Sequence, residues 1–245
     1  MKKNGFTLVE LMIYMAISAV IMLAVYSVVM MAMRTSSSLG RKIITQQDAR
    51  LVLDMMAMDI RNASYNSLHM PGMWRDQNNL PLPFNDVTKI DGNGLCGIQV
   101  ANQSNILVEM DLNGNPFPLP PEDGIIGPPG ENEAIFYSYD GVDTIRRSSN
   151  FGPNFSLFGG AGTGTLVHNN LAGVPLFQYF DGIGTDITAA VVGNPAVIPA
   201  IRRIRITIVA DTEFDDLNTG ARKRMTYTTD VVVKNHALAS YTGGN

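Results

Sequence analysis

The sequence contains only one cysteine and three histidines, and it lacks the HExxH, paired CxxC and GxSxG patterns of familiar enzymes. Cys96 has no second cysteine with which to form an intrachain disulfide. His69, His168 and His236 are scattered and have no evident partner in the sequence, which argues against a nucleophilic mechanism. The glycine-rich segment 159–165 lacks the Gly-Lys-Ser/Thr ending of a phosphate loop. The sequence therefore predicts a protein that is not an enzyme and that needs no cofactor.

Charge is also absent from residues 11–33, a run of 23 residues without Asp, Glu, Lys or Arg. As a helix, such a run is about 35 Å long, which is enough to cross a hydrocarbon core of about 30 Å. Glu10 is the only charge in the apolar segment that begins at Phe6. A carboxylate at the edge of a membrane helix costs about 3 kcal/mol. The run predicts a membrane-spanning helix, and Glu10 requires a partner charge.

The N-terminal segment does not have the pattern of an ordinary secretory signal. Its apolar run exceeds the usual 7–15 residues, and no Ala-x-Ala cleavage pattern follows the run. Cleavage after Gly5, before the apolar run, would instead leave the whole helix in the mature chain with a new amine on Phe6. The formal charge would change from −4 to −6, because Lys2 and Lys3 would be lost.

The segment from Gly5 to Glu10, preceded by Lys2 and Lys3, closely resembles the class III signal of type IV pilins and of the pseudopilins of type II secretion. The resemblance implies that a prepilin peptidase cuts after Gly5 and N-methylates Phe6. It also implies that Glu10 neutralises the N-terminal amine of a neighbouring subunit in a filament. The alternative is a plain single-span anchor that starts in the same way.

Proline is missing from the first 70 residues, and glycine is missing from residues 41–63. We therefore expect one long helix over about residues 6–64, with its weak point at 36–40. A stripe of apolar residues marks the part beyond the membrane, residues 34–64, which we call the stem. The stripe consists of Ile44, Leu51, Met55 and Met58.

The same lack of proline bears on the kind of pilin that the sequence resembles. Many major pilins have a proline at the position of Ser27, whereas the first proline here is Pro71. Ser27 cannot kink a helix as a proline would. The resemblance therefore implies a minor pilin or a pseudopilin, and the size of the chain points the same way.

From about residue 65 the composition changes to a loop-rich pattern with short strands, and we expect residues 65–245 to form a globular, β-rich pilin domain. Strands are predicted at 106–112, 134–140, 144–148 and 174–180. Ile204, Ile206 and Ile208 alternate with polar residues, and residues 225–234 are rich in β-branched side chains, so a long antiparallel hairpin is expected near the C-terminus. The predicted fold class is α+β, with a long N-terminal helix packed on a mostly antiparallel β-sheet.

Three segments of this domain resemble the PilW- and PulJ-type minor pilins. They are residues 134–141 with 144–146, residues 177–181, and residues 233–238. This looser resemblance extends over the whole chain, whereas the stronger one covers about residues 1–35.

An acidic loop offers a weak candidate for a metal site. Asp211, Glu213, Asp215 and Asp216 supply the oxygen ligands that calcium prefers. Their spacing matches no defined motif, and the basic residues 222–224 follow. Ion pairing across a hairpin turn is the simpler interpretation, and calcium is the alternative.

The basic residues at 202, 203, 205 and 222–224, all arginines except Lys223, predict a basic strip on an acidic protein. Few aromatic residues are interleaved with them, and the sequence pI of about 5.3 disfavours nucleic-acid binding. We expect such a face to contact an acidic partner subunit.

Together these features predict a minor type IV pilin that helps to initiate or cap pilus assembly. The alternatives are a minor, J-like pseudopilin of a type II secretion system and, from another class, a filament-tip adhesin or DNA-binding module. The expected order is a leader at 1–5, a membrane helix at 6–33, the stem at 34–64 and the globular domain. The resemblance implies an inner-membrane protein with its C-terminal domain in the periplasm. Its partners would be the prepilin peptidase, other minor pilins or pseudopilins, a major pilin, the assembly platform and the lipid bilayer.

Overall fold

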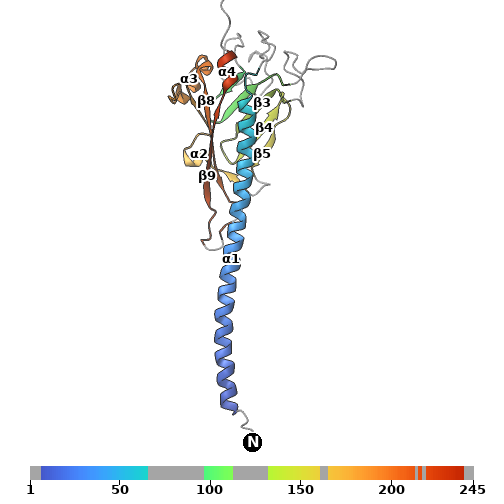
Figure 1. The fold of residues 1–245 in the computed structure, drawn as a ribbon, viewed down its shortest axis with the longest axis vertical. Coiled ribbons are helices and arrows are strands. Elements are labelled where there is room, and N and C mark those ends of the chain that lie inside the picture. Colours follow the sequence, from blue (N-terminus) through green and yellow to red (C-terminus); the bar gives the residue numbers. More distant parts are fainter. Residues whose placement is uncertain are drawn as a thin grey trace, which may run out of the picture.

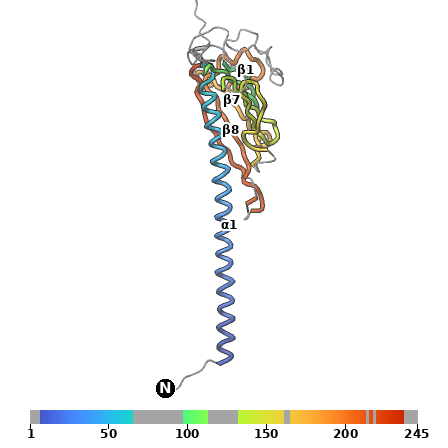
Figure 2. The backbone as a smooth tube through the Cα atoms, turned by 90° about the vertical axis from the view of Figure 1, so that its right-hand side faces the viewer, coloured from blue at the N-terminus to red at the C-terminus, as the bar shows by residue number. Residues whose placement is uncertain are grey.

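A long helix carries a β-rich domain on its C-terminal half (Figure 1). The computed structural model describes residues 7–65, 97–112, 132–160, 165–212, 215–216 and 219–239. The helix runs beyond the domain for much of its length, and the N-terminus lies at its far end (Figure 2). This α+β, pilin-like architecture confirms the predicted fold class.

The N-terminal helix α1 extends from Leu8 to Arg61 without interruption. Its 54 residues give it a length of about 80 Å. The helix passes through residues 36–40 without interruption, so the prediction of one long helix is confirmed. Ser27 fits the helix by donating its hydroxyl hydrogen to the carbonyl oxygen of Ala24.

Two antiparallel sheets form the domain. The first sheet follows chain order and consists of β1 (Ile98–Ala101), β2 (Asn105–Glu109), β3 (Ala134–Tyr139), β4 (Thr144–Ser149) and β5 (Phe155–Gly159). The second sheet consists of β6 (Leu166–Val167), β7 (Phe177–Phe180), β8 (Arg203–Asp211) and β9 (Arg224–Val232). In the second sheet, β8 pairs with β6, β7 and β9. The short helices are α2 (Asn169–Ala172), α3 (Thr188–Gly193), the 3₁₀ helix η2 (Pro195–Ala200) and α4 (Lys234–Ala239).

The predicted strands are all present, and the C-terminal hairpin is the longest pairing. Strands β8 and β9 pair in unbroken register from Arg203 opposite Val232 to Asp211 opposite Arg224. The expectation of one sheet is corrected to two, and β1, β5 and β6 were not predicted. These three strands are short, and β5 begins with two exposed residues, so they lack a clear alternation of apolar and polar side chains.

The core lies where the second half of α1 contacts both sheets, through β8, β9 and β5. Met56 and Ile60 of the helix are fully buried, as are Ile204 and Ile206 of β8. The alternation in β8 is therefore confirmed, because its isoleucines point into the core. Burial of each such side chain contributes about 1.5–3 kcal/mol.

The stem has a second apolar face that the domain does not cover. The predicted stripe of Ile44, Leu51, Met55 and Met58 is real, but it lies on the side of the helix away from the sheets. Leu51 is 65% exposed, whereas Leu53 on the opposite side is 4% exposed. The inner face instead uses residues such as Ala49, Val52, Leu53 and Met56. The stem therefore has more apolar surface than its own domain can bury.

A buried polar cluster fixes the stem to the first sheet. Asp59 of α1 accepts hydrogen bonds from the Tyr137 hydroxyl of β3 and, at 3.2 Å, from the Arg147 guanidinium of β4. Asn132 accepts a further hydrogen bond from Arg147. Burial, followed by the Asp59 carboxylate, raises the pKa of Tyr137. Because the three side chains satisfy one another away from water, they fix the orientation of the helix on this sheet.

A buried histidine, His236, bonds to the residue at the upper end of the stem. The Nε2 atom of His236 in α4 lies 2.9 Å from the carbonyl oxygen of Ile198, which can only accept, so Nε2 carries the proton. Its Nδ1 atom then accepts the hydroxyl hydrogen of Ser64 at 2.8 Å. Ser64 adopts a positive φ of 64° and also accepts from the Gly97 amide. Burial lowers the pKa of His236 from 6.5 to about 4.

The two faces of the stem give a matched test with one chemical change. Leu53→Ala should lower the free energy of unfolding by about 2–5 kcal/mol, because it leaves a cavity in the core. Leu51→Ala should change it by less than about 0.5 kcal/mol, because Leu51 is largely exposed. Thermal and denaturant unfolding of the full chain in detergent measures both. Equal losses in the two variants would contradict the assignment of the faces.

The pKa of His236 predicts a loss of stability in acid. Below pH 6.5 the unfolded chain binds a proton at this histidine and the folded chain does not, so the free energy of unfolding falls by about 1.4 kcal/mol per pH unit. The loss should reach about 3 kcal/mol near pH 4, where the folded state also becomes protonated. His236→Gln should remove this part of the pH dependence. Identical pH profiles for the two proteins would show that His236 is not buried in its neutral form.

Candidate assembly site on the N-terminal helix

The start of α1 places Glu10 in a capping box with Thr7. The Thr7 hydroxyl oxygen accepts the Glu10 backbone N–H, and Glu10 Oε2 accepts from the Thr7 N–H at 3.0 Å and from its hydroxyl at 2.9 Å. The reciprocal bonds satisfy donors that the first turn of a helix leaves open. Sequence reasoning missed this partner, although Thr-x-x-Glu before an apolar run is a recognised signal for it. Gly5 and Phe6 lie outside the described residues.

The helix beyond Glu10 is apolar on all sides. From Leu8 to Met33 its large apolar side chains are exposed except for the half-buried Met30, since the domain begins only farther along the stem. Among the helices that the structure describes, α1 alone is long and apolar enough to cross a membrane. A helix that is hydrophobic all round must be buried in lipid or in other proteins. This half of α1 is therefore suited to membrane anchoring.

The β8–β9 hairpin reaches down the stem toward the membrane segment (Figure 1). The Arg41 guanidinium donates to the backbone carbonyl oxygen of Asp215 at 3.2 Å, which joins the turn of the hairpin to α1. Arg41 lies two helical turns beyond Arg34, the first charged residue after the apolar run. The lower edge of the domain is thus held close to the end of the membrane segment.

The acidic residues of this turn are engaged by basic neighbours. Asp211 accepts from Arg224 at 2.9 Å and lies 3.3 Å from His168, while Asp216 lies 2.7 Å from Lys223. The hydrogen bond to Asp216 raises the pKa of Lys223. Ion pairing across the turn is confirmed for Asp211 and Asp216.

The calcium alternative stays a prediction, because Glu213 lies outside the described residues. Asp215 contributes its backbone oxygen to Arg41 rather than to an acidic cluster. In the described part of the chain, no group of three or more His, Cys, Asp or Glu side chains is arranged to hold a metal ion.

Part of the predicted basic strip on the second sheet is paired within the chain. Arg203 and Arg205 of β8 both donate to Asp230 of β9 at 2.8 Å. These bonds, led by the one from Arg205, lower the pKa of Asp230. The Arg203 guanidinium also lies 3.9 Å from the centre of the Phe180 ring. These arginines therefore present less free positive charge to a partner subunit than the sequence suggested.

Two other residues singled out in the sequence, Cys96 and His69, lie outside the described part. His168 pairs with Asp211, and His236 is enclosed in the core. The long-range partners of His236 and Asp59 could not be found from sequence, because no local pattern connects them with Ser64 or Tyr137.

Comparison with known proteins adds support at the N-terminus. Residues 1–26 match the family model described as the prokaryotic N-terminal methylation motif. Searches of curated proteins and of solved structures found no match. The matched segment covers the Gly5–Glu10 signal and the first part of the membrane helix. The match supports a prepilin-type signal that is processed by a prepilin peptidase. It therefore also supports a structural protein similar to type IV pilins or pseudopilins. Such a protein is anchored in a membrane and assembles with other pilins.

Proposed function

We propose that this chain is a minor type IV pilin that helps to initiate or cap pilus assembly. The observation that carries the proposal is a methylation-type signal that leads directly into an uninterrupted helix, Leu8–Arg61, with a β-rich domain attached only to its second half. Such a chain leaves the first half of the helix for lipid and for other subunits. Cleavage after Gly5 and methylation of Phe6 would produce the mature form.

Two features favour a minor subunit. Ser27 replaces the proline that many major pilins have, and α1 is unbroken at that point. The globular domain is also large and contains two sheets. The second candidate is a minor, J-like pseudopilin of a type II secretion system, which the looser likeness to PulJ-type proteins favours. The genes that neighbour this one would separate the two candidates.

Glu10 is the proposed assembly residue. In lipid its carboxylate is stabilised mainly by an opposite charge, and the methylated Phe6 amine of a neighbouring subunit would supply it. The capping bonds hold Oε2 on the N-terminal side of Glu10. A carboxylate has about four acceptor positions, so it can keep the Thr7 bonds and still accept from an incoming amine. The pair would set how far a new subunit moves along the bundle.

The proposed function also implies that the C-terminal domain lies in the periplasm. Positive charges flank the membrane segment on both sides, with Lys2 and Lys3 before it and Arg34, Arg41 and Lys42 after it. Counting them does not decide the orientation. The likeness to prepilins supports it, because their leaders remain on the cytoplasmic side.

Mass spectrometry of the mature protein tests the central claim. The expected N-terminus is N-methylated Phe6, and pilins or pseudopilins should be identified in the same purified sample. The identity of these partners separates a pilus from a secretion system. Any other N-terminus would contradict the proposed processing.

Two variants separate the charge of Glu10 from its role in the helix cap. Glu10→Gln can still accept from Thr7, yet it loses the charge, so incorporation into the filament should fall at least about tenfold because a neighbouring amine is left unpaired in lipid. Thr7→Ala removes the cap hydroxyl and keeps the charge, so its incorporation should fall much less. Both proteins should reach the membrane and lose the leader. Co-purification with filament subunits measures the effect, and equal incorporation of Glu10→Gln and wild type would refute the role of the charge.

A further inference from the structure

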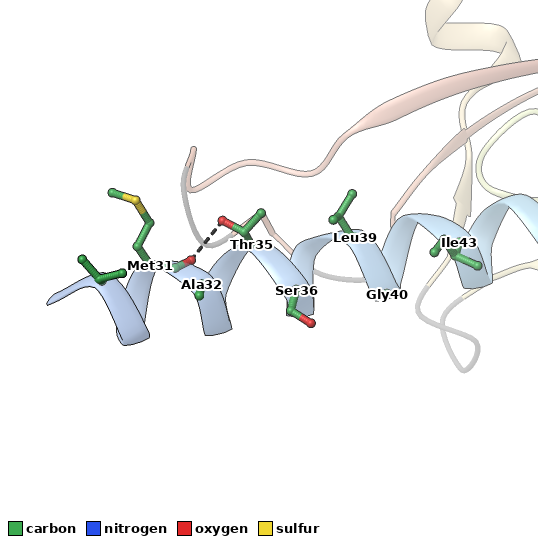
Figure 3. Close-up of a pocket in the computed structure, with 8 residues that line it drawn as sticks. Met31, Ala32, Thr35, Ser36, Leu39, Gly40 and Ile43 are labelled. Atoms are coloured by element: carbon green, nitrogen blue, oxygen red, sulfur yellow. Dashed lines mark hydrogen bonds between the residues drawn. The ribbon is translucent and has the colours of Figure 1, made fainter. Parts of the chain in front are cut away.

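An apolar groove runs along α1 where the helix leaves the predicted membrane segment. It has a volume of about 740 Å³, is largely open to the outside, and the residues that line it all belong to α1. Val28, Met31 and Ala32 line its lower end, and Leu39, Gly40 and Ile43 line its upper end. Thr35 and Leu39 stand on the side of the helix above which the hairpin strands run (Figure 3). The lower end lies in the apolar run, so a lipid chain can enter the groove without leaving the bilayer.

Gly40 shapes the upper end of the groove. A Cβ atom added at this glycine would meet none of the described atoms within 4 Å, so the described part of the fold does not require glycine there. A glycine inside a helix costs about 1 kcal/mol relative to alanine. The space at Gly40 is therefore available to a molecule that lies against the helix from outside.

Two amino groups meet beside this upper end. Lys42 follows Leu39 by three residues and precedes Ile43, so it lies at the margin of the groove. Close contact with the Lys223 amino group, which the hairpin brings to the stem, lowers the pKa of Lys42. Lys223 also pairs with Asp216 at 2.7 Å. Two amines and one carboxylate leave a net positive charge, which an anion between the amines would neutralise.

The surroundings are basic as well. Between Arg34 and Lys42 on the stem, and from Asp211 to Arg224 on the hairpin, the sequence contains six basic and four acidic residues. The whole chain, by contrast, carries a net charge of −4. The positive charge is thus concentrated at the edge of the domain nearest to the membrane segment.

The depth of Lys42 suits a lipid headgroup. Lys42 is nine residues beyond Met33, which places its Cα about 13 Å above the end of the uncharged run. Helical side chains lean toward the N-terminus, here toward the membrane, and lysine reaches several ångströms farther to the interface. The headgroup layer is about 5–7 Å thick on each side of the hydrocarbon core. With its side chain directed toward the membrane, the Lys42 amine can therefore reach the outer part of the headgroup layer.

We propose that this place binds one anionic phospholipid, with an acyl chain in the groove from Val28 to Ile43 and the phosphate between Lys42 and Lys223. The apolar lining, which continues from the membrane segment, suits an acyl chain. The two neighbouring amines suit the phosphate of the headgroup. The bound lipid would link the hairpin to the bilayer and limit rotation of the domain above the membrane. The proposal rests on membrane anchoring of α1 and does not depend on which filament the protein joins.

Native mass spectrometry of the full chain in detergent tests the proposal by titration with phosphatidylglycerol or phosphatidylcholine. The wild-type protein should bind phosphatidylglycerol about tenfold more tightly than phosphatidylcholine. Lys42→Gln with Lys223→Gln should abolish this preference. The matched control, Arg61→Gln with Lys234→Gln, removes two positive charges from the other end of the domain and should behave as wild type. Equal affinity of wild type for the two lipids, or an unchanged preference in the Lys42 and Lys223 variant, would overturn the proposal.

A further variant tests the groove itself. Gly40→Leu would occupy the upper end, so it should weaken the binding of both lipids about tenfold while the unfolding temperature of the domain stays unchanged. Another helix is the competing occupant. If Gly40→Leu keeps its lipid affinity but loses chemical cross-linking to a second subunit, the groove belongs to that helix and the lipid assignment is wrong.

Discussion

The structure depends on one constraint, which is that α1 has more apolar surface than its own domain can cover. The lower half is exposed on every side, and the upper half is apolar on two faces, only one of which contacts the sheets. Water cannot accommodate such a helix, so lipid and other helices must complete it. The exposed apolar surface of α1 is therefore buried only in a membrane or in an assembly. This agrees with the methylation-type signal at the start of the helix.

The domain is attached to α1 at both ends of the stem. Near the membrane, Arg41 holds the turn of the hairpin through Asp215. At the upper end, Asp59 binds Tyr137 and Arg147, and just beyond the helix Ser64 binds His236. Between these two attachment points, the buried face of α1 packs against the sheets. With contacts spread over about 30 Å of helix, the domain is held along its length and does not swing about one point.

Local pattern was enough to predict much of the fold, whereas long-range contacts were not predictable. Alternation at Ile204, Ile206 and Ile208 identified β8, and the lack of proline and glycine identified the helix. The stripe at Leu51 gave no indication of which face meets the sheet, because both faces are apolar. Tyr137 lies 78 residues from Asp59, and His236 lies 172 residues from Ser64, so no spacing rule connects them. At the assembly site, the sequence indicated Gly5, Phe6 and Glu10, but the Thr7 cap was recognised only from the geometry.

The continuity of α1 has a mechanical consequence. Neither Ser27 nor Gly40 interrupts the backbone hydrogen bonds, so the helix has no joint between the membrane and the domain. A flexible kink would convert a displacement of one end into bending, whereas a continuous helix transmits the displacement along its axis. A displacement of the membrane half along the helix axis must therefore move the domain by the same distance. A load on the domain is transmitted to the membrane half just as directly, so α1 behaves as a rigid rod between the two.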